Sequence, residues 1–373
     1  MTTVLGRRNW LRTAAGIAAA DALSLNVLGK AQDSTTGHEE PHGSLVDVGG
    51  VRVGQFTDAR RPTGCTVVIF ERGAVAGVDV RGSAPGTRET DLLNPINTVE
   101  RVNAILLAGG SAFGLNAASG VMRYLEESHM GFRVGANIVP IVPAAILFDL
   151  NVGDGKIRPD EQAGYAACQA ASTAAPKEGN VGAGAGATVG KLFGFAGAMK
   201  SGTGSASVRV GNSGLVVAAM VAVNAAGDVR HRETGRILAG ARAAGGQAFV
   251  DSMAQIMMGA MLQGRRAPGG GNTTIGVVAT NAVLTKSEAT KVAQMAHDGL
   301  ARTINPIHTA VDGDTIFAAA TGTASERADV TTIGSIGAEV MARAVNRAVL
   351  AAWGIPGLPA YRDLAWAHGA VTR

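Results

Sequence analysis

Glycine is the residue that most constrains what this chain can fold into. It accounts for 52 of 373 residues, roughly twice its usual share, while aromatic residues make up only 4%. A core with so few large side chains must be built from aliphatic and small residues, with main chains packed close together. Hydrophobic residues form 46% of the sequence, which is enough for a sizeable core and excludes a largely disordered chain. No Gly-X-Y period runs through the sequence, so a collagen-like fibre is excluded as well.

The N-terminal segment differs in character from the rest of the chain. Arg7 and Arg8 stand before a short, alanine-rich apolar stretch, residues 13–28, which Asp21 interrupts. Paired arginines before such a stretch are typical of a twin-arginine export signal, although a frayed amphipathic helix has the same pattern. The stretch is too short to span a bilayer. We therefore expect residues 1–31 to be a twin-arginine signal peptide, and the mature protein to be soluble, periplasmic or secreted, and without a membrane partner.

The positive charge of the chain is concentrated in that same segment. The whole chain carries a formal charge of +4, and residues 1–31 alone carry +3. The remaining residues are close to neutral, so they offer no strong electrostatic footprint for nucleic acid. We expect no nucleic-acid partner.

Cys65 and Cys168 are the only cysteines, which excludes a disulfide-stapled scaffold. A single bridge between them is conceivable in an oxidising compartment. Twin-arginine cargo, however, folds in the reducing cytosol before export. We expect two buried free thiols, because free cysteine is usually a small core residue.

A polar segment, residues 32–46, separates the expected leader from the rest of the chain. It contains His38 and His42. Two histidines can contact a metal, but a solvated linker is the better interpretation of this composition. We expect residues 32–46 to be a flexible spacer and residues 47–373 to form a single catalytic domain.

Beyond the spacer, strand-like and helix-like patterns are intermixed, without a fixed internal repeat. The expected strands are residues 51–53, 66–70, 75–80, 104–107, 215–223, 273–280 and 315–320. The expected helices are residues 115–127, 159–175, 235–263, 286–302 and 332–353. This mixture, with antiparallel strand pairs, indicates helices packed on sheets in layers.

The glycine-rich segment 179–191, GNVGAGAGATVGK, does not fit a phosphate-binding motif. A Walker loop needs glycine five residues before the Gly of Gly-Lys, where this chain has Ala185, and a hydroxyl residue after the lysine, where it has Leu192. The dinucleotide pattern also fails, since Ala187 stands at its third glycine position. We expect no nucleotide cofactor.

Ser111 follows two glycines, Gly109 and Gly110, but does not complete a nucleophile motif. A nucleophile elbow needs glycine two residues after the serine, where the chain has Phe113. A helix N-cap is therefore the favoured local role of Ser111. The sequence has neither an H-E-x-x-H motif nor paired C-x-x-C motifs, so we expect no metal site.

One feature is not explained by packing. A Gly/Pro/Arg-rich loop, residues 264–271, ends at Asn272, and Thr273-Thr274 then begins a buried strand. A hydroxyl at the start of a strand, behind a loop, is the layout of an N-terminal nucleophile hydrolase. The Thr273 hydroxyl would attack the Asn272 carbonyl, form an ester and, after hydrolysis, release the upstream piece.

The freed α-amine of Thr273 would then serve as the general base. Its reference pKa is about 7.7–8.0, so at neutral pH it can take the hydroxyl proton without help from a histidine. Threonine is also β-branched, which restricts χ1 and partly aims the nucleophile. The alternative is a hairpin loop followed by an ordinary strand threonine, and the local sequence alone favours that alternative.

Several stretches together resemble the DmpA-type family, which comprises L-aminopeptidase D-amidase/esterases, β-peptidyl aminopeptidases and nylon-oligomer hydrolases. The stretches are residues 48–54, 78–90, 109–115, 182–191, 271–274 and 312–315. The resemblance extends over about residues 45–355. It implies an αββα sandwich of the N-terminal-nucleophile type. It also implies self-cleavage between Asn272 and Thr273 into two associated chains, which usually assemble into a homo-oligomer, most often a tetramer of such pairs.

The resemblance also assigns roles to individual residues. Thr273 corresponds to the nucleophile and Asn224 to an amide that stabilises the oxyanion. Lys191 corresponds to a lysine that holds or polarises the hydroxyl, and Asp312 with Asp314 to an acidic pair. That pair would orient Lys191 and the α-amine, or bind a substrate ammonium. On local sequence alone, the same residues are a turn asparagine, a surface lysine and an Asp-Gly turn.

The substrate pocket is expected to include Ser111 and Phe148. Phe148 stands where the family often has a tyrosine, so any role for a phenolic hydroxyl is lost or moved. A threonine nucleophile with two aspartates is similar to the nylon-hydrolase branch.

The resemblance therefore implies a self-processing amide hydrolase, most simply an aminopeptidase that acts on small peptides or amino-acid amides. Two alternatives are an endo-acting amidase of the nylon-oligomer kind and an acyltransferase of the ornithine acetyltransferase type. Export argues against the acyltransferase, because acetyl-ornithine chemistry is cytosolic. A non-catalytic binding protein that kept the fold is a third alternative.

Overall fold

The computed structural model describes residues 43–262, 271–324 and 328–368. The expected signal peptide, most of the expected spacer and the Gly/Pro/Arg-rich loop up to residue 270 lie outside these residues. Within them, no helix has the length and apolar character needed to cross a bilayer.

Nine strands form one mixed sheet with the order β10-β11-β14-β16-β2-β4-β7-β3, and β1 pairs with β2. Their bounds are Val51–Thr57 (β1), Gly64–Val80 (β2), Thr87–Arg88 (β3), Arg101–Ala108 (β4), Ala144–Ile146 (β7), Thr203–Arg209 (β10), Val216–Ala222 (β11), Ile275–Thr280 (β14) and Thr315–Ala320 (β16).

The long strand β2 connects the two halves of this sheet. Its first part pairs with β1 and β4, and its last part pairs with β16. The register with β4 shifts between Ile69 and Ala74, and such an irregularity lets a strand bend. Side chains on β2 alternate between two cores, because successive residues of a strand point to opposite faces. Val67 and Ile69 belong to one core, and Val68 and Phe70 to the other.

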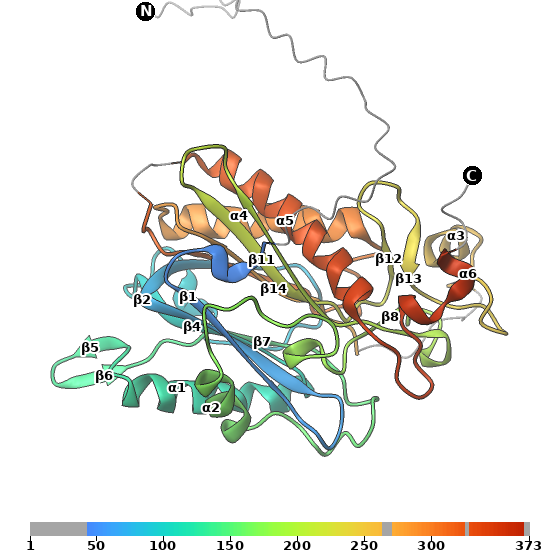
Figure 1. The fold of residues 1–373 in the computed structure, drawn as a ribbon, viewed down its shortest axis with the longest axis horizontal. Helices are drawn as coiled ribbons and strands as arrows, with labels where there is room; N and C mark the ends of the chain where they lie inside the picture. The colour runs from blue at the N-terminus through green and yellow to red at the C-terminus, as the bar shows by residue number, and fades with distance from the viewer. Residues whose placement is uncertain (1–42, 263–270, 325–327, 369–373) are drawn as a thin grey trace, which may run out of the picture. The chain divides into compact units, whose positions relative to one another are not determined.

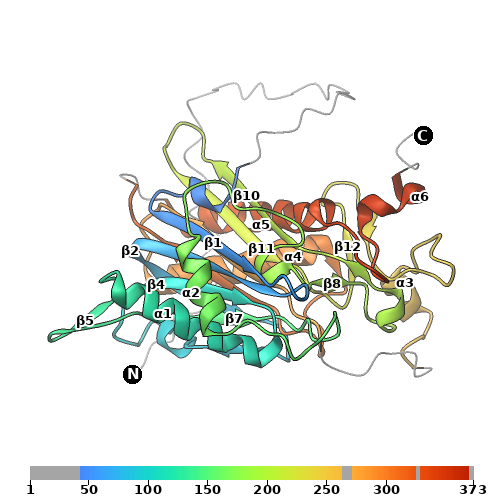
Figure 2. The ribbon, with the colours of Figure 1, turned by 60° about the horizontal axis from the view of Figure 1, so that its bottom comes forward.

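Four longer helices cover the strands from both sides: α1 (Ala117–Glu127), α2 (Glu161–Gln169), α4 (Lys286–Thr303) and α5 (Val330–Ala351). Helices α1 and α2 lie on one side of the strands and α4 and α5 on the other, in both views (Figures 1 and 2). Three cores separate the layers. One core lies under α1 and α2, and one lies under α4 and α5. The third lies between the two halves of the sheet, which form the two strand layers. The expected αββα layering is confirmed.

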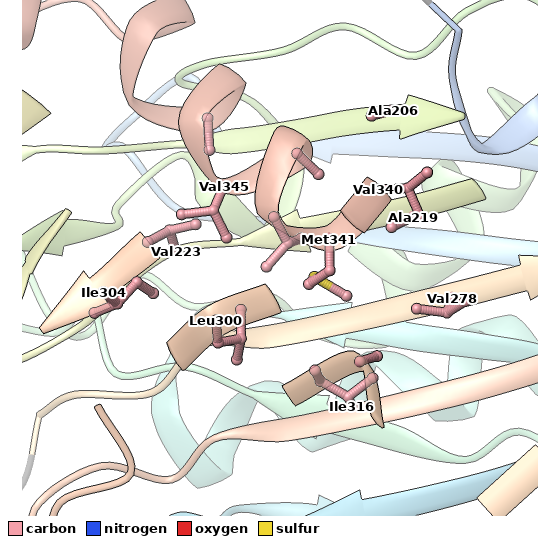
Figure 3. Close-up of a cluster of buried hydrophobic side chains, with 14 of the residues drawn as sticks. Ala206, Ala219, Val223, Val278, Leu300, Ile304, Ile316, Val340, Met341 and Val345 are labelled. Atoms are coloured by element: carbon pink, nitrogen blue, oxygen red, sulfur yellow. The ribbon is translucent and has the colours of Figure 1, made fainter. Parts of the chain in front are cut away.

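The core under α4 and α5 shows how a chain with few aromatics fills its interior. In Figure 3, Met341 and Val345 of α5 gather with Leu300 of α4 and Val278 of β14. All four side chains are at most 1% exposed. Aliphatic and alanine side chains let the helices approach the sheet closely, as the glycine-rich composition predicts.

The shorter elements are as follows. The strands are β5 (Phe132–Val134), β6 (Asn137–Val139), β8 (Thr188–Val189), β9 (Met199–Lys200), β12 (Asp228–Arg230), β13 (Ile237–Ala239) and β15 (Ile304–Asn305). The short α-helices are α3 (Ser252–Met257) and α6 (Ala365–His368). The 3-10 helices are η1 (Leu45–Asp47), η2 (Asp91–Leu93), η3 (Ser111–Asn116), η4 (Gly182–Gly184), η5 (Phe195–Gly197) and η6 (Tyr361–Asp363).

The long helix predicted over residues 235–263 is wrong. Within residues 235–262, which the structure describes, the chain forms β13, a hairpin-like turn and, as its only helix, the short α3. Gly245 and Gly246 both have positive φ, at 86° and 69°, and an isolated bridge joins Arg242 to Phe249 across the turn. A Gly-Gly pair that adopts left-handed backbone angles turns the chain back on itself, so alanine-rich composition does not make a helix here.

The end of the expected spacer and the two cysteines are both buried in the fold. Residues 43–46, assigned to the flexible spacer, are packed into the fold, because Leu45 is fully buried and its N–H donates to Ser205 Oγ at 2.9 Å. Cys65 and Cys168 are free and buried, as predicted. Burial raises the pKa of the Cys168 thiol to about 12, which keeps this thiol protonated and unreactive.

Candidate active site

The pairing of β14 with β16 brings two distant segments of the chain together. The two strands run parallel, and Ile275 lies opposite Thr315. The residues just before each strand are therefore neighbours, because parallel strands begin at the same edge of a sheet. The Gly313 N–H donates to the Asn272 carbonyl oxygen at 3.0 Å. The predicted cleavage bond thus lies beside the predicted acidic pair.

Thr273 is buried at this edge, with only 3% of its surface exposed. Its hydroxyl donates to the carbonyl oxygen of Asn272, and its N–H donates to the Asn224 carbonyl oxygen at 2.9 Å. The hydroxyl is therefore in contact with the peptide group that it is expected to attack. A Cβ atom on Gly313 would lie 2.8 Å from Thr273 Oγ1 and 2.3 Å from the Ala84 oxygen, so only glycine leaves room for the hydroxyl at that position.

Lys191 and Asn224 contact the main chain on either side of Asn272, at the Gly271 carbonyl and the Thr273 N–H. Lys191 Nζ donates to Asn224 Oδ1 at 2.7 Å, to the Asn224 carbonyl at 3.1 Å and to the Gly271 carbonyl at 2.9 Å. Asn224 follows β11, and its Nδ2 donates to the Phe148 carbonyl at 2.9 Å and to the Gly271 carbonyl at 3.3 Å. Two side-chain donors therefore converge on the Gly271 carbonyl oxygen.

The orientation of the Asn224 amide is fixed by its neighbours. Its Oδ1 accepts from the Thr188 N–H at 3.0 Å as well as from Lys191. Because both partners of Oδ1 are donors and both partners of Nδ2 are carbonyls, the amide has one consistent orientation. The Nδ2 group consequently points toward the carbonyl oxygens of Phe148 and Gly271. A donor aimed at carbonyl oxygens is what an oxyanion site needs.

Lys191 is almost fully buried, and burial lowers the pKa of its ammonium to about 7. The negative charges of Asp312, Asp149 and Asp314 act in the opposite direction but do not compensate for the lost hydration. An amine with a pKa near 7 can give or take a proton at neutral pH. The structure places Lys191 at the site, as predicted, although its contacts are with Asn224 and Gly271.

Asp312 and Asp314 are fully buried behind the nucleophile. Asp312 accepts from the Ala226 N–H at 3.2 Å and the Thr309 N–H at 3.0 Å. Burial, followed by the charge of Asp314, raises the pKa of the Asp312 carboxyl. Asp314 accepts from the Thr274 N–H at 2.7 Å. Both carboxylates thus bind the main chain around the nucleophile.

A cavity of about 480 Å³ opens in front of Thr273. It is lined by Ala84, Ser111, Ile146, Phe148, Asp149, Asn151, Val152, Thr188, Lys191, Gly194, Phe195, Gly271, Asn272 and Thr273. Ser111 and Phe148 are on its wall, as predicted. Asp312 and Asp314 are not among the lining residues, so the cavity geometry does not support their alternative role as receptors of a substrate ammonium.

Ser111 does not act as a helix N-cap. It is the first residue of η3, whose N-cap is Gly110, and no side chain caps this helix. Ser111 adopts a φ of 56°, in the left-handed region that non-glycine residues rarely occupy. Its N–H donates to the Leu147 carbonyl at 3.0 Å. This backbone geometry belongs to the cavity wall rather than to a helix start.

Asp149 is the one carboxylate on the described part of the cavity wall, and it is already engaged. Its oxygens accept from the Arg61 guanidinium, from Thr63 Oγ1 at 2.7 Å and from the Gly110 N–H at 2.9 Å. Arg61 also donates to the carbonyl oxygens of Asp149 and Val152. This buried cluster fixes the wall segment that begins at Phe148. Nothing in the sequence singled out Arg61 or Asp149, because Arg61 follows Asp58 and Arg60 in a charged segment, Asp149 stands in an apolar one, and neither belongs to a recognisable motif.

The sequence gave no signal for His308, and it marked Gly313 only as part of the stretch 312–315 that resembles the family. The Gly313 N–H contacts the carbonyl of the predicted cleavage bond, and a main-chain donor leaves no mark in a sequence. His308 contacts Asp314, with Nδ1 2.9 Å from Oδ2. Its position in a turn between two strands hides this contact from any local pattern.

Most of the chain is similar to known proteins. Residues 43–361 match the model of peptidase family S58. The chain is 44% identical over 356 residues to an uncharacterised aminopeptidase of Mycobacterium leprae, covering 86% of this chain and 94% of the relative. It is 31% identical over 323 residues to a 6-aminohexanoate-oligomer endohydrolase of a Kocuria species, covering 81% of this chain and 84% of the relative.

A solved structure extends the comparison to the fold. It is that of an L-aminopeptidase D-Ala-esterase/amidase from Ochrobactrum anthropi, described as a variant of the Ntn hydrolase fold. It superimposes with a TM-score of 0.65 at 19% identity, covering 87% of this chain and 93% of that chain. At this level of identity the likeness supports the fold alone.

Proposed function

Because the chain belongs to peptidase family S58 and is a hydrolase of its aminopeptidase and amidase type, we propose that it is self-processing and uses Thr273 as its N-terminal nucleophile. The observation that carries the proposal is the contact between the Thr273 hydroxyl and the Asn272 carbonyl oxygen. A carbonyl held by its own downstream hydroxyl, and by the Gly313 N–H, is arranged for intramolecular attack.

In the proposed self-cleavage, the Thr273 hydroxyl oxygen adds to the Asn272 carbonyl carbon. The carbonyl oxygen becomes an oxyanion, which the Gly313 N–H at 3.0 Å stabilises. The C–N bond then breaks, the hydroxyl proton passes to the Thr273 nitrogen, and an ester joins the two chains. Water hydrolyses the ester and leaves a carboxylate on Asn272 and a free amine and hydroxyl on Thr273.

In the proposed turnover, the free α-amine of Thr273 takes the hydroxyl proton as the substrate is attacked. Its contact with the Asn224 carbonyl would keep the amine in place. Lys191 Nζ and Asn224 Nδ2, which bind the Gly271 carbonyl in the uncut chain, become available to the substrate carbonyl when the upstream end moves away. These donors would stabilise the oxyanion of each catalytic cycle.

Substitutions of Thr273 test this proposal. Thr273→Ala should give one uncut, inactive chain, and Thr273→Ser should still be cut, because serine keeps the hydroxyl. Thr274→Val is the matched control, since Thr274 is buried one residue further on and its hydroxyl has no partner among the described residues. Complete processing of Thr273→Ala, followed on denaturing gels, would refute the nucleophile assignment.

We propose an aminopeptidase or amidase acting on small peptides or amides as the first candidate activity, supported by the aminopeptidase name of the 44% identical relative. An endo-acting amidase is the second candidate. The described cavity wall favours it, because Asp149 is engaged with Arg61 and no other carboxylate lines the wall to receive an ammonium. Rates on one small apolar amide, with its amine free and acetylated, discriminate the two. A strong preference for the free amine supports the aminopeptidase, and equal rates support the endo-acting amidase.

Export by the twin-arginine route and assembly into a homo-oligomer of processed pairs, as a tetramer, remain part of the proposal. Arg7 and Arg8 lie outside the described residues. Replacing both with lysine should retain the enzyme in the cytoplasm, and unchanged export would remove this part of the proposal. Light scattering of the purified protein tests the tetramer.

A further inference from the structure

His308 has an unusual backbone and an unusual partner. It lies in the segment between β15 and β16, with a φ of 55°, which non-glycine residues rarely adopt. In this conformation both its main-chain nitrogen and its ring reach one carboxylate oxygen. The N–H donates to Asp314 Oδ2 at 3.2 Å, and Nδ1 lies 2.9 Å from the same atom. The backbone conformation thus serves a double contact with Asp314.

The proton on the ring can be assigned from this contact. With Asp314 as a carboxylate, its oxygens only accept, so we assign the proton to Nδ1, which then donates to Asp314. The other ring nitrogen, Nε2, is buried and has no partner among the described residues. The hydrogen bond to Asp314 is therefore the polar contact that orients this ring.

A second histidine packs behind the first. His297 on α4 meets His308 edge-to-face, with ring centroids 4.7 Å apart and an interplanar angle of 73°. Its ring is fully buried, and its Nε2 lies 3.0 Å from the Asp79 carbonyl oxygen. Burial is the main cause that lowers the pKa of His297 to about 4, so His297 is a neutral packing surface at working pH. It packs directly against the His308 ring.

Asp314, which His308 contacts, is also bonded to the main chain next to the nucleophile. Its Oδ1 accepts from the Thr274 N–H at 2.7 Å, which is the nitrogen of the peptide that joins Thr273 to Thr274. The carboxylate therefore fixes the plane of that peptide, and the direction of the Thr273 side chain follows from its backbone. A small misplacement of a nucleophile lowers its rate strongly, because attack requires aligned atoms.

We propose that His308 is a positioning residue for the nucleophile, which holds Asp314 in the orientation that fixes the Thr273–Thr274 peptide. The inference rests on the proposed function of Thr273. It assigns to His308 no contact with substrate.

The test uses variants of the full chain that remove or retain the donor. His308→Leu keeps an apolar side chain of similar size but has no donor, and we expect self-cleavage and kcat to fall about tenfold or more with KM little changed. His308→Asn keeps an N–H donor close to the ring position and tolerates positive φ, so we expect it to recover to within about threefold of wild type. His129→Leu is the matched control, because His129 is exposed and has a φ of 57°.

A pH profile separates positioning from a merely structural role. The titratable groups in contact with the His308 ring are Asp314 on its own segment and His297 on α4. Asp79 and Arg81, at the end of β2, act on His297, and Asp312 is affected by the charge of Asp314. The pKa of the buried Asp312 carboxyl is already raised by burial and by the charge of Asp314, and loss of a nearby polar donor favours its protonated form further. The acid limb of kcat/KM should therefore move to higher pH in His308→Leu, whereas a structural defect would lower the rate equally at every pH.

The outcomes are separable from those for the proposed function. If Thr273→Ala is still cut and active, the proposed function fails, whatever His308 does. If Thr273→Ala is dead but folded His308→Leu cuts and turns over within about threefold of wild type, only the present inference fails. Should His308→Leu not fold, His308→Gly removes the ring without strain at positive φ and should show the same loss. If neither variant folds, His308 is a folding residue and the inference is overturned.

Discussion

Lys191 and Lys200 are both buried in the glycine-rich part of the chain, at 7% and 0% exposure. Burial is the main cause that lowers the pKa of each ammonium to about 7. Lys200 Nζ donates to three main-chain carbonyls, which we call the carbonyl cage: Gly184 at 3.2 Å, Ala187 at 3.0 Å, and Ser201. It is not among the residues that line the cavity in front of Thr273.

Lys191 has the same pKa but different neighbours. It lines the cavity and donates to the Asn224 side chain and to the Gly271 carbonyl next to the expected cleavage bond. The two lysines therefore show that a lowered pKa alone does not identify a functional group. Access to a cavity, and a contact with the Gly271 carbonyl beside the proposed cleavage bond, distinguish Lys191 from Lys200.

The largest expected effect separates the two lysines by activity. Lys191→Met should lower self-cleavage and kcat by about 10³-fold, because it removes a charged donor aimed at the reacting carbonyl region. The midpoint of urea unfolding should fall less than in Lys200→Met, since each acceptor of Lys191 keeps a second donor: the Thr188 N–H, the Thr273 N–H or Asn224 Nδ2. Lys200→Met serves as the matched control. Equal loss of kcat in the two variants would end the distinction between the regions.

The next effect concerns the partner of Lys191. Asn224→Ala should lower kcat by about 10²- to 10³-fold, the usual result of removing one oxyanion donor. Self-cleavage should fall less than turnover, because the Gly313 N–H serves the Asn272 carbonyl. Single-turnover cutting and steady-state hydrolysis, measured on the same preparation, check this. A change in turnover below about threefold would make Asn224 a turn residue only.

The carbonyl cage predicts a loss of stability rather than of activity. Lys200→Met leaves buried carbonyls without this donor, which we expect to lower the free energy of unfolding by about 2–3 kcal/mol. Chemical denaturation measures this, and kcat per folded molecule should remain within about threefold of wild type. Unchanged stability would show that the cage is dispensable.

A pH dependence of stability is expected from both lysines. Each has a folded-state pKa of about 7 against an ordinary value of 10.5, so between these pH values the unfolded chain binds more protons than the folded one. The free energy of unfolding should therefore rise between about pH 7 and pH 10. Urea titrations of the uncut Thr273→Ala chain at several pH values measure the slope, which should be shallower in Lys200→Met. A flat or falling profile would contradict the burial of charge at both positions.

Much of the fold could be predicted from the sequence because its signals are local. Strand β16, Thr315–Ala320, has the bounds that its apolar run predicts, and helix α4 differs from its predicted span by one residue. The failure at residues 235–263 has a physical cause, since alanine favours a helix while Gly245 and Gly246 turn the chain. The alternation of strand-like and helix-like segments predicted the layers. It did not predict that one long strand, β2, connects the two halves of the sheet.

The site was predictable only in part. Thr273 was signalled by the order of loop, hydroxyl and strand, and Asn224, Lys191 and the aspartates came from the family resemblance. Gly313 and His308 act through a main-chain N–H and through one carboxylate oxygen. Their positions depend on the pairing of β14 with β16 and on a left-handed turn, which no single stretch of sequence specifies.

The masses and N-terminal sequences of the polypeptides in the purified wild-type protein test the central claim most directly. The account predicts two chains, of which the downstream one comprises residues 273–373 and begins Thr-Thr-Ile-Gly. The same measurement on Thr273→Ala should give a single chain that spans residue 273. Wild-type protein that hydrolyses amides while remaining a single uncut chain, or a downstream chain that begins at another residue, would contradict the account.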